Sequence, residues 1–123
     1  MKKSIEVTEY IHPSAVDEMR SSIEAAAGNE VFFLGKTDDH LVVKTVSVLA
    51  RGDRECVPAV TRSVSQGDVV IHNHPDGPLS PSKADLDVAS ELGDMGCGFY
   101  IVDNDVERVY PVVEPSREEK LAL

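Results

Sequence analysis

The chain has 123 residues, 41% of them hydrophobic and 28% charged, a composition typical of one folded domain and too apolar for a disordered chain. Its 22 acidic and 12 basic residues give a formal net charge of −10, which argues against direct binding of nucleic acid. No apolar run reaches the ~20 residues that a membrane helix needs, and no apolar stretch typical of a secretory signal follows the first lysines, so we expect a soluble, cytoplasmic protein.

The first half of the chain predicts a helix followed by a pair of strands. Ser14 is the expected N-cap of the helix, which ends where Gly28 follows. The two strands are rich in β-branched and aromatic residues. The expected elements are a helix over residues 14–27, strands over 30–34 and 40–49, and a polar turn over 37–39. Residues 51–66 have no clear pattern and are interpreted as a short helix or an irregular crossing loop.

The second half predicts a buried strand, a helix and a closing pair of strands. The expected elements are a strand over residues 68–72, a Pro/Gly/Ser loop over 75–81, a helix over 82–95, and strands over 98–102 and 106–113. Strands and helices mixed in this order favour an α/β or α+β sandwich, in which helices cover a sheet. We expect residues 1–115 to form this single domain and residues 116–123 to be a tail or the start of a connection to a further domain.

The two cysteines, Cys56 and Cys97, are far apart and neither belongs to a C-x-x-C motif. This excludes a zinc ribbon and a thioredoxin-like site. Both are interpreted as reduced, buried thiols that pack as small hydrophobic residues.

Two of the four histidines, His72 and His74, flank Asn73 at the carboxyl end of the expected buried strand. Side chains alternate across a strand, so we expect both imidazoles on one face and Asn73 on the other, where it would hydrogen-bond the backbone of the loop over residues 75–81. Two neutral imidazoles on one face form a ready pair of metal ligands. His12 and His40 have no partners in the sequence and are interpreted as surface residues.

The helix that begins at Ser82 contributes an acid to its apolar face. Asp85, Val88, Ala89 and Leu92 follow the spacing i, i+3, i+4, i+7 and therefore form one stripe. An unpaired carboxylate on a buried stripe is costly, and a cation is one way to stabilise it. Ser82-x-x-Asp85 also fits a capping box with Asp in place of Glu, and taken alone the pair favours the cap.

The short loop over residues 75–81 returns the helix start to the end of the buried strand, so His72, His74 and Asp85 are expected to meet. Three ligands of this kind with an open fourth position are typical of a catalytic zinc site rather than a structural one. A hydrolytic water would take the fourth position, with its pKa lowered toward ~7.

The spacing H-x-H-x7-S-x2-D is met by His72, His74, Ser82 and Asp85. It resembles the signature of the JAMM (MPN-plus) metalloprotease family. The longer string HNHPDG, which begins at His72, resembles the bacterial RadC branch of that family. The resemblance is sharpest over residues 68–102.

The resemblance implies a deaminase-like α/β domain around one zinc ion (Zn2+), with His72, His74 and Asp85 as its ligands. It also implies that Ser82 donates a hydrogen bond to the oxyanion of the tetrahedral intermediate. The general base of the family is a glutamate on an upstream strand, and Glu30, which opens an apolar strand, is the matching residue. A glutamate at such a place is otherwise often a solvated strand end.

The function that the resemblance implies is a zinc-dependent peptidase or isopeptidase that cuts after the C-terminal tail of a ubiquitin-like or sulfur-carrier protein. A zinc nucleobase deaminase shares the inferred fold but needs H-x-E and P-C-x-x-C motifs, and the chain has neither. The alternative is a RadC-like accessory module of a DNA-repair or helicase protein, without peptidase activity. A metal-free scaffold is disfavoured because all the expected ligands are intact.

Overall fold

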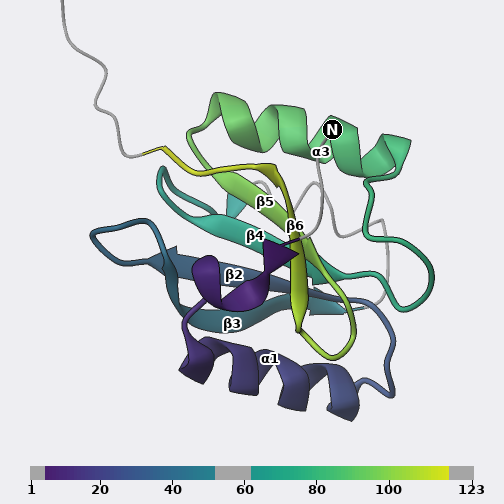
Figure 1. Cartoon of the computed structure of the whole chain (residues 1–123). Coiled ribbons are helices and arrows are strands. Elements are labelled where there is room, and N and C mark those ends of the chain that lie inside the picture. The colour runs from purple at the N-terminus through teal and green to yellow at the C-terminus, as the bar shows by residue number, and fades with distance from the viewer. Residues whose placement is uncertain (1–4, 52–61, 117–123) are drawn as a thin grey trace, which may run out of the picture.

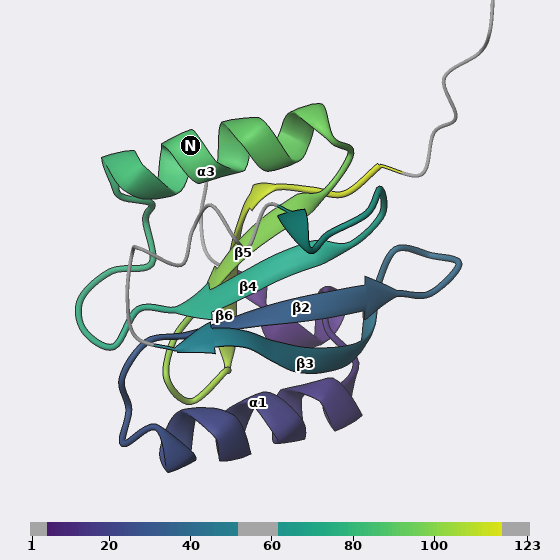
Figure 2. The ribbon, with the colours of Figure 1, turned by 180° about the vertical axis from the view of Figure 1, so that it is seen from behind.

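The computed structural model describes residues 5–51 and 62–116. The elements in chain order are β1 (Ile5–Glu6), a 3-10 turn η1 (Val7–Glu9), α1 (Pro13–Ala25), β2 (Val31–Thr37), β3 (Val43–Arg51), β4 (Val69–Asn73), α3 (Lys83–Asp94), β5 (Gly98–Val102) and β6 (Arg108–Val113). The six strands form one sheet, and α1 and α3 cover its opposite faces (Figure 1; Figure 2). The expected mixed α/β sandwich with flanking helices is confirmed.

The strand order across the sheet is β1-β6-β5-β4-β2-β3. β4 and β5 are parallel, whereas the other neighbouring pairs are antiparallel. A parallel pair needs a crossover connection, and α3 supplies it between β4 and β5. β4 is therefore an interior strand with all five of its residues buried, which is why its sequence is an almost continuous apolar run.

The face of the sheet that packs against α1 carries the larger apolar core. Its buried members from α1 are Ala15, Val16, Met19 and Ile23, and those from β2, β4 and β5 are Val31, Phe33, Val69, Ile71, Tyr100 and Val102. Successive side chains of a strand point to opposite faces, which places Val31 and Phe33 of β2 and Val69 and Ile71 of β4 in this core.

The face beneath α3 carries a smaller core. It contains Phe32, Val64, Val70, Val88, Ala89, Leu92, Cys97 and Phe99. The predicted stripe of α3 is confirmed, since the buried residues of this helix are Asp85, Val88, Ala89 and Leu92. Cys97 is a buried free thiol, as expected, and its Sγ lies 3.1 Å from the carbonyl oxygen of Ser65.

The N-terminus of α1 corrects a prediction. The N-cap is His12, not Ser14, and Pro13 takes the first helical position. Pro is well suited to that position because its missing N–H would have no partner there and its φ is already helical. His12 Nδ1 accepts a hydrogen bond from the backbone N–H of Ser14, at 3.2 Å, so the ring replaces the usual serine oxygen.

The start of β3 and the strand β1 also differ from the prediction. β3 begins at Val43 instead of residue 40 because Asp38 closes a turn, accepting hydrogen bonds from the N–H groups of His40 and Val42. β1 was not predicted: it has two residues, and its place in the sheet comes from pairing with β6. Cys56 and most of the segment 51–66 lie outside the described residues, as does almost all of the tail after residue 115.

Among the described residues, no helix combines the length and the hydropathy required to cross a bilayer.

Candidate metal centre

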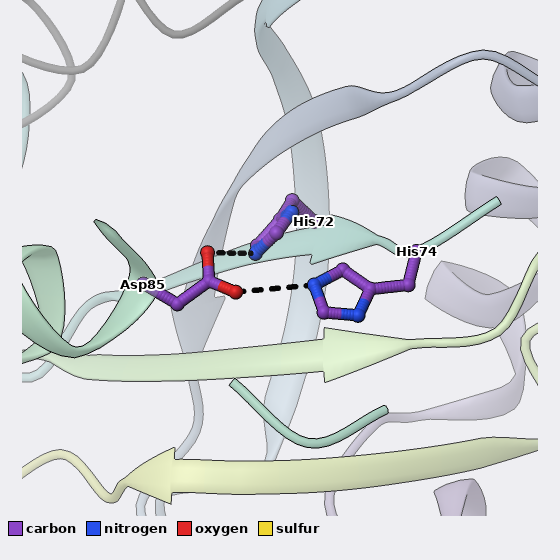
Figure 3. A group of neighbouring side chains, drawn as sticks. All are labelled: His72, His74 and Asp85. Carbon is purple, nitrogen blue, oxygen red and sulfur yellow. Dashed lines mark hydrogen bonds and ion pairs between the residues drawn. The ribbon is translucent and has the colours of Figure 1, made fainter. Parts of the chain in front are cut away.

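Strand β4 brings His72 and His74 to one face at its carboxyl end, on the side of α3. The two ring centroids are 5.1 Å apart, and His72 is 1% exposed. In Figure 3 the two imidazoles point toward the same carboxylate, that of Asp85. Alternation along an extended chain is thus sufficient to place the pair, as expected from the H-x-H spacing.

Two phenylalanines from the neighbouring strands hold the ring of His72 between them. Phe32 of β2 stacks on it at a centroid distance of 4.8 Å and an interplanar angle of 11°. Phe99 of β5 stacks on the ring from its other neighbour strand, at 5.2 Å and 21°. The two rings fix the orientation of the His72 imidazole, so that its Nε2 points toward Asp85.

Asp85 lies at the start of α3, where the capping box with Ser82 fixes its carboxylate. Ser82 Oγ accepts a hydrogen bond from the Asp85 N–H at 3.1 Å, and Asp85 Oδ2 accepts one from the Ser82 N–H at 2.9 Å. The same carboxylate faces both histidines: Oδ1 lies 3.1 Å from His72 Nε2, and Oδ2 lies 3.1 Å from His74 Nε2 (Figure 3). The cap and the histidine cluster are therefore two uses of one side chain, not competing interpretations.

The outer nitrogens of both histidines have acceptors, which assigns their protons. His74 Nδ1 lies 3.1 Å from the carbonyl oxygen of Pro78, and His72 Nδ1 lies 2.7 Å from Glu30 Oε2. A carbonyl and a carboxylate accept hydrogen bonds, so each Nδ1 donates, and in the neutral rings each Nε2 carries a lone pair. This arrangement, with an outer oxygen orienting each imidazole, is the usual surrounding of metal-binding histidines.

The inner atoms of the cluster fit a cation. His72 Nε2 is buried, and its 3.1 Å contact with Asp85 Oδ1 is an ion-pair distance that lacks the geometry of a hydrogen bond. One nitrogen from each of His72 and His74 and one oxygen of Asp85 all lie within 4.8 Å of one another. Lone pairs of two imidazoles and a carboxylate that converge in this way repel one another unless a proton or a metal ion lies between them. The His72–His74–Asp85 cluster therefore has the donor set of a metal site.

Charge and burial shift the pKa values of all three residues. Burial lowers the pKa of His72, but the carboxylates of Asp85 and Glu30 outweigh burial and the net shift is upward. The contact with Asp85 raises the pKa of His74 above its ordinary value. For Asp85, burial raises the pKa, yet His72, His74 and the backbone N–H of Ser82 together hold it well below its usual range. The carboxylate thus shifts both imidazoles toward their protonated form, and the imidazoles shift the acid toward its ionised form.

The other two predicted site residues lie at the same place. Glu30 directly precedes β2, its side chain is 28% exposed, and it shares a cavity of about 350 Å³ with His74, Ser82 and Asp85. Ser82 is exposed at the N-cap of α3. Its oxygen accepts a hydrogen bond from Asp85, which leaves the hydroxyl proton available for donation. The structure brings all five residues together, and their roles in a reaction remain predictions.

Sequence reasoning did not identify Phe32 and Phe99 as parts of the site. Phe32 pairs directly with His72 in the β2–β4 register, whereas Phe99 pairs with Val70, on β5 beside β4. Their stacking on His72 depends on which strands become neighbours, and the chain order does not specify that. The alternation of each strand was readable and would have placed both rings on the face of the histidines once the sheet order was known.

Comparison with known proteins supports the resemblance of the histidine motif. The family model described as the RadC-like JAB domain matches residues 3–103, most of the chain. A UPF0758 protein of Desulfitobacterium hafniense is 38% identical over 53 residues, and a UPF0758 protein of Staphylococcus haemolyticus is 36% identical over 53 residues. Each match covers 42% of this chain and only 23% of the relative. The family match spans the cluster and five of the six strands of the sheet, all but β6, so this chain belongs to the RadC-like JAB domain family, within the wider JAMM (MPN-plus) relationship.

Proposed function

We propose that this domain is a zinc-dependent peptidase or isopeptidase. The observation that carries the proposal is the convergence of His72 Nε2, His74 Nε2 and the Asp85 carboxylate beside a cavity that also holds Glu30 and Ser82. Two imidazoles and one carboxylate with an open side are typical of catalytic zinc sites. A zinc ion bound there would act as a Lewis acid and lower the pKa of a coordinated water to ~7.

The two remaining polar residues have complementary roles in the proposed hydrolysis. Glu30 has one carboxylate oxygen engaged by His72, so Oε1 is the atom assigned to take a proton from the attacking water and later deliver it to the leaving amine. Ser82 directs its hydroxyl proton to the oxyanion that develops on the substrate carbonyl. The carbonyl must therefore lie between Glu30 and Ser82, in the cavity that both of them line.

For the substrate, we extend the proposal to the C-terminal tail of a ubiquitin-like or sulfur-carrier protein, cut after its terminal glycine. An extended chain without bulky side chains suits a cavity of about 350 Å³ whose walls include Phe32, Val88 and Phe99. Such a tail is held through its backbone with little demand on side chains. The net charge of −10 favours a neutral or basic partner.

The test compares zinc-loaded wild type with two glutamate variants on fusions of such carrier proteins. Glu30→Gln should retain zinc and lose hydrolysis, because an amide does not accept the proton. Glu24→Gln, an exposed glutamate on α1, is the matched control and should cut normally. A Glu30→Gln variant with near-normal kcat would overturn the assignment of the base.

Ser82→Ala separates catalysis from metal binding in the same assay. We expect a fall in kcat of about 10²–10³, the size typical of a lost oxyanion donor. The missing cap should also cost about 1 kcal/mol in the free energy of unfolding. Zinc content, measured by metal analysis, should be unchanged because the Asp85 carboxylate remains. If no fusion is cut and the domain instead binds single- or double-stranded DNA tightly at low salt, the accessory-module function replaces the peptidase.

A further inference from the structure

We infer that Asn73, the residue between the two histidines, is a positioning residue that holds Glu30 against His72. The inference rests on the proposed function, because it assigns Asn73 a task only if Glu30 and His72 work at a metal site. Asn73 is 0% exposed and lies on the face of β4 opposite to the histidines. A buried amide is costly unless it is hydrogen-bonded, so its partners indicate what it does.

The Asn73 amide binds the backbone on both sides of Glu30. Its Oδ1 accepts a hydrogen bond from the N–H of Val31 at 2.8 Å. Its Nδ2 donates to the carbonyl oxygen of Asn29 at 3.2 Å. The residue before Glu30 and the residue after it are thus fixed by one side chain, and the direction in which Glu30 leaves the backbone follows from both contacts.

This contact replaces backbone pairing at the point where the sheet ladder stops. The last register pair between β2 and β4 is Phe32 with His72, so the next residues toward Glu30 have no such pair in β4. The side chain of Asn73 binds β2 one residue beyond that last pair, at the N–H of Val31. This contact keeps the chain before β2 close to β4, where Glu30 reaches His72. At that point Glu30 Oε2 lies 2.7 Å from His72 Nδ1.

A second asparagine completes the clamp from the turn between β5 and β6. Asn73 Nδ2 also donates to Asn104 Oδ1 at 2.6 Å, and Asn104 Nδ2 donates to the carbonyl oxygen of Gly28 at 3.0 Å. Gly28 has φ +80°, a backbone conformation that favours glycine, and a Cβ there would make a tight contact of 3.2 Å with Asn104 Nδ2. The loop before β2 is therefore held at Gly28, Asn29 and Val31.

Because side chains alternate along the chain, the consecutive residues His72, Asn73 and His74 serve both faces of the sheet. The two histidines present nitrogens to Asp85 on one face, while Asn73 controls the position of Glu30 from the other. The three residues are consecutive, so a movement of the two expected ligands would also move Asn73 and, through it, Glu30. A purely structural Asn73 would stabilise the loop but would have no specific effect on the zinc site.

The test is a double-mutant cycle on zinc affinity, which needs no substrate. Variants Asn73→Ala, Glu30→Ala and the double variant are titrated with zinc against a chelator, with Asn29→Ala as a control that removes an exposed side chain and keeps the clamped backbone carbonyl. We expect each single variant at position 30 or 73 to lose about tenfold in zinc affinity, the lower end for removal of a group that orients a ligand. In the Glu30→Ala background, Asn73→Ala should add less than about threefold. Fully multiplicative losses would overturn the inference.

If Asn73→Ala fails to fold, a second variant and an NMR measurement still test the inference. Asn104→Ala removes one partner of Asn73 at a half-exposed position and should retain the fold. NMR of the metal-free protein should show the His72 Nδ1 proton protected from exchange in wild type and Asn29→Ala, and faster exchange in Asn104→Ala. An unchanged His72 proton in Asn104→Ala together with multiplicative zinc losses would contradict the clamp, whether or not any peptide is cut. Failure of all peptidase assays, with the cycle as expected, would overturn only the proposed function.

Discussion

Ile71 and His72 are consecutive residues of β4, both buried, and they face opposite sides of the same sheet. Among the residues that the structure describes, Ile71 packs beneath α1 in a core of sixteen buried residues, whereas the apolar core on the side of His72 has eight. The side with fewer apolar contacts also holds a buried imidazole and a buried carboxylate. Of the two faces, the one beneath α3 thus combines the smaller described apolar core with a polar site.

The two buried polar side chains on the α3 face, His72 and Asp85, are both held by specific contacts. His72 is stacked between two aromatic rings, and Asp85 is held by the cap of its own helix. The orientation of each polar group is therefore fixed by neighbouring residues of the protein itself. Four predictions test whether zinc binding depends on the face beneath α3 and stability on the face beneath α1, from the largest expected effect to the smallest.

The expected metal ligands give the largest effect. Wild type should bind about one zinc per chain, and His72→Ala or His74→Ala should each abolish tight binding because a three-ligand site loses one of its ligands. Metal analysis after dialysis measures the stoichiometry, with His40→Ala, an exposed turn histidine, as the control. Full zinc occupancy in the double variant would contradict the site.

The face beneath α1 should give the converse result. Ile71→Ala leaves a cavity in the larger core, so we expect a loss of about 2–5 kcal/mol in the free energy of unfolding. Zinc stoichiometry should stay at that of wild type in the folded fraction. Chemical denaturation measures the loss, and Val48→Ala, at a 38% exposed position of β3, should change stability by less than about 0.5 kcal/mol.

A matched pair of aromatic substitutions compares the faces directly. Phe99→Leu removes a ring that stacks on His72, at a cost of about 0.5–1.5 kcal/mol for the aromatic contact, and should weaken zinc binding. Phe33→Leu changes a buried ring on the other face, in the core beneath α1. Zinc titration should separate them, with Phe33→Leu unaffected. Equal losses of zinc affinity in both variants would mean that general loosening, and not the stacked ring, controls the histidine.

The smallest effect concerns pH, and its sign differs between the metal-free and zinc-bound proteins. The pKa values of His72 and His74 are raised, so their contribution to metal-free stability is complete below the ordinary histidine pKa and is lost as pH rises through the raised values. The lowered pKa of Asp85 gives a contribution that is present above the ordinary carboxyl pKa and is lost on acidification. Zinc affinity should instead increase with pH, because protons compete for the same nitrogens. Thermal unfolding with and without zinc, from pH 3 to pH 8, measures the histidine, Asp85 and zinc trends.

Much of the candidate site was predictable because its geometry is local. The positions of His72 and His74 follow from strand alternation, and those of Ser82 and Asp85 from one helix turn. Asn73 lies on the face away from the histidines, as predicted, but the backbone that it binds is that of Asn29 and Val31, not that of the loop over residues 75–81. Glu30 is more distant in sequence, and its proximity was expected only from the resemblance to the JAMM family.

The features that were missed depend on long-range pairing or on unusual side-chain roles. β1 is too short to show a periodicity, and its pairing with β6 joins the two ends of the domain. His12 was not expected to cap a helix, since Ser, Thr, Asp and Asn are the usual N-cap residues. Asn104 reaches Gly28 across 76 residues of sequence, and no local pattern indicates such a contact.

All three expected ligands belong to one uninterrupted strand–loop–helix segment, residues 72–85, while Glu30 lies far from it in the sequence, directly before β2. The loop within that segment, residues 75–81, is largely exposed and lines the cavity through Pro75 and Asp76. Insertions tend to be tolerated in exposed loops. A change in the length of this loop would therefore alter the wall of the cavity, while His72 stays fixed within β4 and Asp85 within the first turn of α3.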